Sequence, residues 1–243
     1  MIDAKKPKPK AVLFLDFDGT ITCRDAVDTI LETYADPKWL SFEADWRAGR
    51  IGSRDCLQAQ MSLVRATRRQ LDTLLDSMTV DPGLNTLLEV CSRQKISAHI
   101  ISDGFDYCVR RILARAVNGH RSLIKNVCAS HLDISTHPWR TEFPYFHQAC
   151  GHGCATCKPS VMRLLNPMNA ETVFVGDGLS DRYAVETADL VFAKNELADY
   201  CRANSIVHIE YQDLADVAAH LERWLMARAF VADPFKQEKC ASA

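Results

Sequence analysis

The chain is organised around one stretch near its start, Leu13-Phe14-Leu15-Asp16-Phe17-Asp18-Gly19-Thr20-Ile21-Thr22. An apolar run from Ala11 to Leu15 ends abruptly in two carboxylates and a glycine. A run of this length is typical of a buried strand, and open α/β sheets place their chemistry at the carboxyl ends of such strands. Asp16 and Asp18 are two residues apart, so in extended backbone their side chains share a face. Two carboxylates so near each other repel, unless a divalent cation lies between them, one carries a proton, or both. The alternative interpretation of this stretch is a strand followed by a plain turn with no functional role.

Composition restricts the class of protein. The 243 residues are enough for a core domain and a smaller insertion. The 29 basic and 31 acidic residues give a formal net charge of −2, which offers no electrostatic case for nucleic acid. The basic start, Lys5 to Lys10, lacks the apolar stretch of a signal peptide or membrane span. Ten cysteines without such a signal indicate a reducing compartment, so we expect a cytoplasmic protein with no membrane partner.

Strand and helix patterns alternate along the chain. Apolar runs predict core strands at residues 11–16, 97–101 and 171–175, and strands that alternate with helices favour an α/β fold with a doubly wound parallel sheet. Residues 25–77 show helical periodicity only, which predicts a small all-helical insertion after the first strand. We interpret three aromatic residues as the core of that insertion: Trp39, Phe42 and Trp46.

Two further helix starts are predicted from turn residues. Asp81-Pro82-Gly83 is expected to open a helix, with Asp81 as its N-cap and Pro82 at the first helical position. Lys158-Pro159 is expected to begin another helix, which runs through Leu165. Between these helices, residues 129–150 suit a hairpin or flap.

The three predicted core strands all end in polar, glycine-containing loops, after Leu15, Ile101 and Val175. In a parallel sheet these loops emerge at one edge, so we expect their side chains to converge. They would supply hard oxygen ligands that suit Mg²⁺, namely Asp16, Asp18, Asp177 and Asp181. Ser102 and the amides beyond it could hold an anion, and Lys158 adds a positive charge. Such a set suits one phosphoryl group.

A carboxylate in such a site can act as a nucleophile and form an aspartyl phosphate. Asp16 is placed for this role, and Asp18 for protonating the leaving alkoxide and then activating water. A phospho-acceptor signalling module also uses acidic residues at strand ends and is the alternative from another class. The helical insertion and Asp18 favour an enzyme, because a signalling module needs neither a lid nor an acid for a leaving group.

Four motifs in this order resemble those of the haloacid dehalogenase superfamily of phosphatases: Asp16-Phe17-Asp18-Gly19-Thr20, Ser102, Lys158 and Gly176-Asp177-Gly178-Leu179-Ser180-Asp181. The resemblance covers about residues 11–228 and implies a Rossmann-like core. It implies Asp16 as nucleophile and Mg²⁺ ligand, and Asp18 as acid/base and ligand through its main-chain carbonyl. It further implies Asp177 as a ligand, Asp181 as orienting metal-bound water, and a phosphate-binding set of Ser102, the Asp103 amide and Lys158.

The resemblance also divides the chain. It implies a core of residues 11–23 and 79–228, a helical cap at 24–78, a flap and cysteine-rich loop at 126–157 within the core, and a tail at 229–243. The cap is similar to that of the phosphoserine phosphatase-like branch, whose caps close over small substrates and exclude water. Arg24 and Asp25 are the expected cap-side residues for reading the rest of the substrate, with solvated polar residues as the alternative.

Within that branch, the stretch from Cys150 to Asp177 is similar to methionine-salvage phosphatases that act on 2-hydroxy-3-keto-5-methylthiopentenyl-1-phosphate. Phosphocholine and phosphoethanolamine phosphatases carry related cysteine-rich segments and provide an alternative substrate class, as does phosphoserine. One departure is Asp103, where phosphoserine phosphatases usually have glycine, and its carboxylate argues against phosphoserine. The partner that we expect is a small phosphate monoester.

The cysteine spacing permits a metal site of another kind. Cys150, Cys154 and Cys157 form C-x3-C-x2-C, and Cys128 is available at the end of a predicted strand. Three ligands and a candidate fourth would permit a structural Zn²⁺, and reduced thiols in a loop are the alternative.

Overall fold

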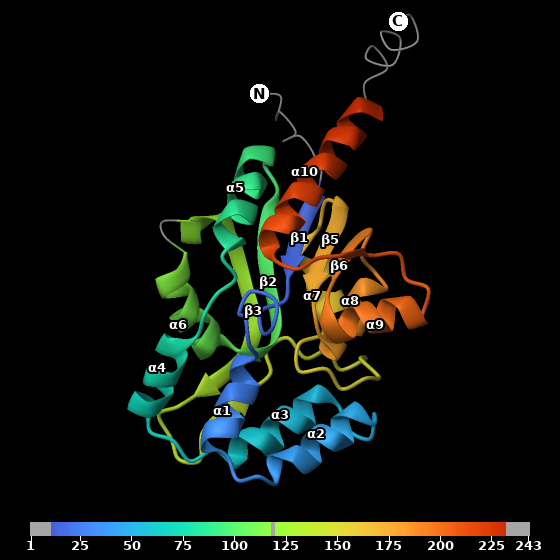
Figure 1. The fold of residues 1–243 in the computed structure, drawn as a ribbon. Coiled ribbons are helices and arrows are strands. Elements are labelled where there is room, and N and C mark those ends of the chain that lie inside the picture. Colours follow the sequence, from blue (N-terminus) through green and yellow to red (C-terminus); the bar gives the residue numbers. More distant parts are fainter. Residues whose placement is uncertain (1–10, 118–119, 232–243) are drawn as a thin grey trace, which may run out of the picture.

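The computed structural model describes residues 11–117 and 120–231, so the basic start and residues 232–243 of the predicted tail lie outside it. Its sheet has seven strands in the order β4-β3-β2-β1-β5-β6-β7 (Figure 1). All neighbouring pairs are parallel except β3 with β4, which confirms the predicted α/β fold with a doubly wound sheet. The strands are β1 (Ala11–Leu15), β2 (Ser97–Phe105), β3 (Ile124–Asp133), β4 (Arg140–Glu142), β5 (Glu171–Gly176), β6 (Leu190–Ala193) and β7 (Ile209–Glu210).

The direction of winding reverses at β1. From β1 the chain builds outward through β2 to β3, then returns to the other side of β1 with β5 and continues to β6 and β7. The carboxyl ends of β1, β2 and β5 therefore meet where the strand order reverses, which is the general ligand-binding position of open α/β sheets. The amide of Asp16 is held there by a 2.9 Å hydrogen bond to the Val175 carbonyl of β5.

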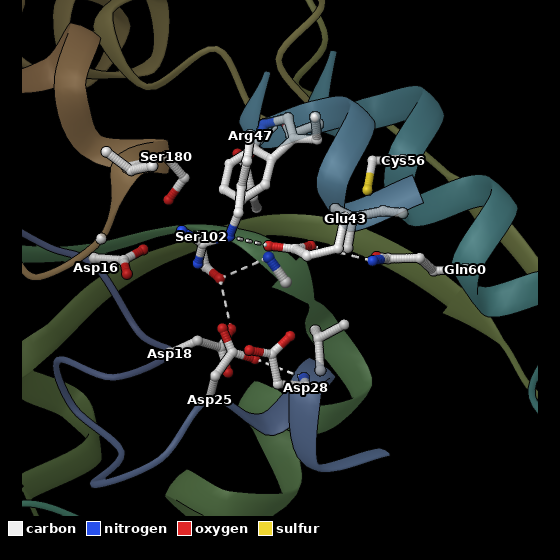
Figure 2. Close-up of a pocket in the computed structure, with 18 of the residues that line it drawn as sticks. Asp16, Asp18, Asp25, Asp28, Glu43, Arg47, Cys56, Gln60, Ser102 and Ser180 are labelled. Atoms are coloured by element: carbon white, nitrogen blue, oxygen red, sulfur yellow. Dashed lines mark hydrogen bonds and ion pairs between the residues drawn. The ribbon is translucent and has the colours of Figure 1, made fainter. Parts of the chain in front are cut away.

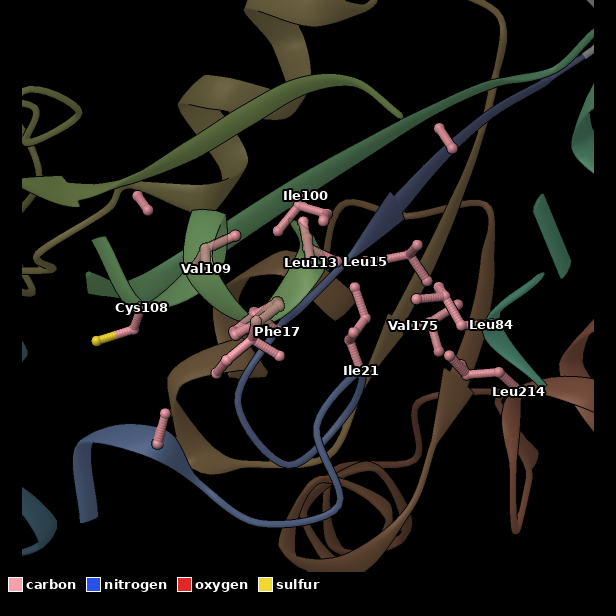
Figure 3. Close-up of a cluster of buried hydrophobic side chains, with 14 of the residues drawn as sticks. Leu15, Phe17, Ile21, Leu84, Ile100, Cys108, Val109, Leu113, Val175 and Leu214 are labelled. Atoms are coloured by element: carbon pink, nitrogen blue, oxygen red, sulfur yellow. The ribbon is translucent and has the colours of Figure 1, made fainter. Parts of the chain in front are cut away.

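Apolar residues of β1 alternate between two helix layers. Leu13 and Leu15 join one hydrophobic cluster (Figure 3), and Val12 and Phe14 join the other, so the strand is buried on both faces. The first cluster packs against α5 (Leu84–Gln94), α6 (Asp106–Ala116) and α10 (Leu214–Val231); the second packs against α7 (Lys158–Leu165), α8 (Arg182–Val185) and α9 (Asn195–Ala203). Each fully buried aliphatic side chain contributes about 1.5–3 kcal/mol. This burial on both faces fixes the strand that carries Asp16.

Four helices lie between β1 and β2 in the chain: α1 (Ala26–Tyr34), α2 (Trp39–Arg47), α3 (Ser53–Ser62) and α4 (Arg68–Ser77). Figure 1 shows α1, α2 and α3 beyond the carboxyl ends of the strands, while α4 packs on α6. Leu71 and Leu75 of α4 belong to the same hydrophobic cluster as the sheet. Helix α2, by contrast, buries no residue completely. Of its three aromatic residues predicted as cap core, Trp39 is partly buried against that cluster, whereas Phe42 and Trp46 are not part of it, so the prediction was wrong for those two.

Two local predictions differ from the structure. Helix α5 begins at Leu84, three residues after Asp81, because the Asp81 carboxylate accepts hydrogen bonds from the amides of Gly83 (2.8 Å) and Leu214 (3.1 Å). Asp81 thus joins the start of α5 to that of α10 and is not an N-cap of the predicted kind. Strand β2 continues past Ile101 to Phe105. Within the described residues, no helix combines the length and apolar character needed to cross a membrane.

Candidate active site

A cavity of about 220 Å³ opens at the reversal point of the sheet (Figure 2). The carboxyl ends of β1, β2 and β5 line one side of it with Asp16, Asp18, Ser102 and Asp177. Behind this lining, Lys158 bonds to both Asp16 and Asp181. We call these six residues the floor. Helices α1, α2 and α3 form the opposite side. We call its charged and aromatic residues from the start of α1 and from α2 the cap wall: Asp25, Asp28, Glu43, Trp46 and Arg47. The three loops that the sequence pattern places at one edge therefore do share one cavity.

Lys158 is the positive centre of the floor. Its side chain comes from the first residue of α7 and is only 1% exposed. The Lys158 Nζ lies 2.7 Å from an Asp16 Oδ and 2.5 Å from an Asp181 Oδ. Burial alone lowers the pKa of Lys158, but the charges of Asp16 and Asp181 outweigh it and raise the pKa above its ordinary value. The lysine is therefore cationic at neutral pH and ties β1 to the loop after β5.

Three floor carboxylates lie close enough to share a cation. Oxygen atoms of Asp16, Asp177 and Asp181 all lie within 4.8 Å of one another, the one such group of possible ligands in the described residues. Burial and the Asp181 charge raise the pKa of Asp16 well above its ordinary value, and the same two causes raise the pKa of Asp177 to about 6. Lys158 therefore balances only part of the negative charge. A hard oxygen set with excess negative charge fits a divalent cation such as Mg²⁺.

Hydrogen bonds fix the orientation of these carboxylates. The Thr20 hydroxyl donates to Asp177 (2.9 Å), and the amides of Asp177 and Gly178 donate to Asp181 (3.1 and 3.4 Å). Asp181 accepts these bonds and the Lys158 bond, so both of its oxygens have a partner, and its exposure is 0%. By accepting from the amides of Asp177 and Gly178, Asp181 fixes the backbone conformation of the loop after β5.

Asp18 turns away from the other floor carboxylates. One of its oxygens accepts from the Ala26 amide at the start of α1 (2.9 Å), and the other accepts from the Ser102 hydroxyl (3.3 Å). Burial raises the pKa of Asp18 above its ordinary value. A carboxyl with a raised pKa suits proton transfer, and this one stands between the floor and the cap wall.

Glycines make room for the floor carboxylates. A Cβ added at any of three glycines would lie 2.2 or 2.3 Å from a carboxylate oxygen, with Gly19 against Asp177, Gly104 against Asp18 and Gly176 against Asp181. Gly19 also has φ +75°, a conformation that glycine adopts without strain. The glycines of the Asp-Gly and Gly-Asp pairs are thus the sequence signal for where the carboxylates approach the backbone.

The carboxylate of Asp103, the residue after Ser102, does not point at the floor. It accepts from the Ser53 hydroxyl (2.5 Å) at the start of α3 and from the Thr156 amide (3.0 Å). Both oxygens are thereby occupied, which weakens the expectation that this carboxylate would oppose phosphoserine.

The cap wall contains residues that the sequence patterns did not indicate. Arg47 Nε lies 3.0 Å from Glu43 Oε1, and its Nη1 lies 2.7 Å from Glu196 Oε1 of α9. This pair of contacts joins α2 to the core. Asp28 also faces the cavity, and burial and Glu43 raise its pKa to about 6. No local motif marks these residues, because their convergence depends on how α1, α2 and α9 pack.

The two predicted cap-side residues differ in position. Asp25 lines the cavity and caps α1 by accepting from the Asp28 amide (2.9 Å). Arg24 instead pairs with Glu32 on the exposed side of α1, at 3.0 Å, and is not part of the cavity lining. The helical geometry explains the split, because adjacent residues at a helix start point in different directions.

The zinc site that the cysteine spacing permits is not supported. Cys150 Sγ and Cys154 Sγ are 3.6 Å apart, but Cys157 is hydrogen-bonded with Ser160 and Cys128 is a member of the buried cluster under α7. These four residues do not form a group with metal-ligand spacing among those that the structure describes. The described cysteines are free thiols, which is the alternative drawn from the sequence.

A sequence model of the haloacid dehalogenase-like hydrolases matches residues 13–186. The curated relatives include 2-hydroxy-3-keto-5-methylthiopentenyl-1-phosphate phosphatases, of which two serve as examples. The one from Geobacillus thermodenitrificans is 28% identical, over 89% of this chain and 97% of its own. The one from Bacillus pumilus is 25% identical, over 88% of this chain and 92% of its own.

Solved structures with the same fold include phosphoserine phosphatases. One, a phospho-aspartyl intermediate analogue of phosphoserine phosphatase, superposes with a TM-score of 0.66 at 18% identity and covers 88% of this chain and 99% of its own. A cytosolic 5′-nucleotidase IIIB bound to cytidine superposes with a TM-score of 0.62 at 12% identity, over 92% and 88%. At these identities the likeness concerns the fold.

Proposed function

The chain belongs to the haloacid dehalogenase-like hydrolase family and is a phosphatase, and from that premise we propose that it hydrolyses a small phosphate monoester through an aspartyl phosphate on Asp16. The observation that carries this proposal is the floor itself. Asp16 lies within hydrogen-bond distance of buried Lys158, and Ser102, Asp18 and Asp177 line the same cavity. This set offers a nucleophile, a cation and a proton donor to one phosphoryl group.

In the first step, an Asp16 oxygen attacks phosphorus and the bond from phosphorus to the ester oxygen breaks. Asp18 gives its proton to the departing alkoxide, which leaves as an alcohol. The raised pKa of Asp18 supports this role, because burial holds a proton on the carboxyl at higher pH. Lys158 and the Ser102 hydroxyl balance charge on the phosphoryl oxygens.

In the second step, Asp18 is a carboxylate and takes a proton from water. The resulting hydroxide attacks phosphorus of the aspartyl phosphate, the bond from phosphorus to the Asp16 oxygen breaks, and inorganic phosphate leaves. Asp16 returns as a carboxylate and Asp18 as an acid. The same residue thus serves both steps, first as an acid and then as a base.

Mg²⁺ fits this floor, and we propose Asp16, Asp177 and Asp181 as the residues that hold it, with the main-chain carbonyl of Asp18. When bound, the cation would neutralise the repulsion between the attacking carboxylate and the phosphoryl oxygens. The close approach of the three carboxylates and the raised pKa of Asp177 support this assignment. Free thiols in the described residues support a reducing, cytoplasmic location.

The first candidate substrate is the one named for the curated relatives, 2-hydroxy-3-keto-5-methylthiopentenyl-1-phosphate. The cap wall favours a second candidate, the phosphate ester of an amino alcohol such as phosphoethanolamine or phosphocholine. Asp25, Asp28 and Glu43 face the cavity together with one cation, Arg47, which is paired with Glu43 and Glu196. The excess of acidic groups, beside the indole of Trp46, would attract an ammonium group.

The test is turnover of p-nitrophenyl phosphate with MgCl₂ by the wild-type chain and by Asp16→Asn. We expect multiple turnovers that chelation stops and fresh Mg²⁺ restores, and a loss of at least about 10⁴-fold in the variant. Stoichiometric labelling without turnover would favour the phospho-acceptor module, and full activity in chelator would remove the cation from the proposal. A panel containing the enol phosphate, phosphoethanolamine, phosphocholine and phosphoserine would then rank the substrates.

A further inference from the structure

The start of helix α3 is joined to the phosphate-binding side of the floor by a closed ring of three hydrogen bonds. The Ser53 hydroxyl donates to one oxygen of Asp103 (2.5 Å), and the Thr156 amide donates to the other (3.0 Å). The Ala155 amide donates to the Ser53 hydroxyl (2.9 Å) and closes the ring. Three segments that are distant in sequence therefore meet at Asp103.

Each segment of the ring leads directly to a part of the site. Asp103 follows Ser102, and the Thr156 hydroxyl donates to the Ser102 carbonyl at 2.8 Å. Lys158 is two residues after Thr156 and begins α7. Ser53 begins α3 and is 9% exposed. A movement of α3 would therefore act on the backbone that holds Ser102 and Lys158.

A second contact, between the backbones of the start of α3 and the loop at Gly153, restricts movement of α3 relative to that loop. The Arg54 amide donates to the Gly153 carbonyl at 3.1 Å. A Cβ on Gly52 would lie 2.3 Å from that carbonyl oxygen, so the two backbones touch where both residues are glycine. Gly153 has φ +63°, a left-handed conformation that glycine adopts without strain. Helix α3 is thus seated on the loop before Lys158 by its backbone as well as by Ser53.

We propose that Asp103 is a positioning residue that couples seating of α3 to the order of Ser102 and Lys158, so that the cap and the phosphate site become ordered together. This inference rests on the proposed function. It assigns the Asp103 carboxylate to the link between cap and floor, since both of its oxygens are occupied by Ser53 and Thr156. A direct contact of this carboxylate with the substrate is the competing role.

The coupling is tested by a double-mutant cycle of Ser53→Ala and Asp103→Asn, with Ser62→Ala as the control on the same helix. The Ser62 hydroxyl bonds only to the Ala59 carbonyl of its own helix. With p-nitrophenyl phosphate and Mg²⁺, we expect each ring variant to lower kcat about tenfold, as the loss of a hydrogen bond to a charged group does, with KM within about twofold. The kcat of the double variant should be no lower than that of the less active single variant, because both changes open the same ring.

A readout without turnover separates positioning from a structural role. In the wild-type chain, inorganic phosphate with MgCl₂ should slow amide hydrogen exchange across residues 52–62, although none of the floor residues comes from α3. Ser53→Ala should abolish this protection, and Ser53→Thr, which keeps the hydroxyl, should restore it. Ser62→Ala should behave as the wild type does.

Two results would overturn the coupling. If the rate losses of Ser53→Ala and Asp103→Asn multiply in the double variant, the two residues act separately and Asp103 contacts the substrate directly. If phosphate leaves exchange in 52–62 of the wild-type chain unchanged, seating of α3 is independent of the phosphate site. Both results can occur in an enzyme that turns over p-nitrophenyl phosphate, so they are distinct from failure of the proposed function.

Discussion

The floor and the cap wall face the same cavity but hold their charges in different ways. On the floor, Asp16 and Asp181 are 5% and 0% exposed and share the Lys158 ammonium. On the cap wall, Arg47 pairs with Glu43 and Glu196 through half-exposed side chains, and Asp28 is exposed to the cavity. The floor is a fixed array set by strand ends, whereas the cap wall is an open array set by helix packing.

This difference suits the floor to the reaction at phosphorus and the cap wall to the choice of substrate. A buried array keeps its geometry and strengthens electrostatic interactions, which is what a reaction at phosphorus needs. An exposed array can accept different leaving groups, because solvent and side-chain movement screen each charge. We therefore expect floor variants to change rate and stability, and cap-wall variants to change preference among substrates.

After Asp16→Asn, the largest effect is expected for Asp18→Asn, which should lower the rate of phosphoenzyme formation or hydrolysis by about 10²–10⁴. The amide keeps the shape of the side chain but cannot donate and recover a proton in the two steps. Rapid-quench measurement with p-nitrophenyl phosphate resolves the two phases, and Asp25→Asn on the cap wall is the matched control. A near-native rate for Asp18→Asn would assign the acid/base to another residue.

Next in size is the contrast between Lys158→Met and Arg47→Met. Removing Lys158 leaves two buried carboxylates without their counter-charge, which should lower the free energy of unfolding by about 3–5 kcal/mol in chelator. Removing Arg47 breaks half-exposed pairs and should cost less than about 1 kcal/mol. Urea unfolding of both variants measures the difference, and equal costs would mean that the floor and the cap wall are held alike.

A smaller effect is expected for Gly19→Ala relative to Gly49→Ala. Both glycines have positive φ, +75° and +70°, but a Cβ at Gly49 meets nothing within 4 Å whereas one at Gly19 lies 2.2 Å from Asp177. The shared backbone strain is about 1–2 kcal/mol, and displacement of Asp177 should add about 1–3 kcal/mol at Gly19 only. The Mg²⁺ concentration for half-maximal activity should also rise for Gly19→Ala alone; its rise in both variants would refute the assignment of Asp177.

The smallest effect is expected for Asp28→Asn and depends on pH. Burial and Glu43 raise the pKa of Asp28 to about 6, so the folded protein binds this proton more tightly than the unfolded chain and loses stability as pH rises from about 4 to 6. Asp28→Asn removes that loss and should raise stability at pH 7 by less than about 1 kcal/mol, because solvent in the open cavity screens the charge of this side chain. At pH 4 the gain should vanish. Thermal unfolding at both pH values checks this, and an equal gain at both would contradict the raised pKa.

The floor could be expected from sequence because strand ends are local features. An apolar run followed by Asp16 marks the end of β1, and one followed by Gly176 and Asp177 marks the end of β5. Parallel pairing then brings those ends together. Helix α7 likewise has the predicted bounds, since Pro159 defines its first turn. Asp81 misled for the opposite reason, because its carboxylate binds the distant amide of Leu214 as well as that of Gly83.

The cap wall could not be expected in the same way. Asp28, Arg47 and Glu196 occupy ordinary helical positions, and only the packing of α1, α2 and α9 turns them toward one cavity. Trp46 is of a residue type that is usually buried, but α2 buries none of its residues completely, and Trp46 lines the cavity. Charge and aromaticity in a helix pattern thus indicate burial or exposure only once the neighbouring elements are placed.

The hydrophobic cluster that α1 and α4 share with the sheet has a consequence for how new specificities arise. Ile30 and Leu71 are at 0% exposure in the same cluster as Leu13, so half of the cap cannot be deleted or grafted without dismantling the fold. Helix α2 buries no residue completely, and of its residues Trp39 alone is partly buried against that cluster. Substitutions that change substrate preference, in nature or in a directed-evolution library, are therefore best tolerated in α2. There they alter the side of the cavity that faces the leaving group and leave the buried cluster unchanged.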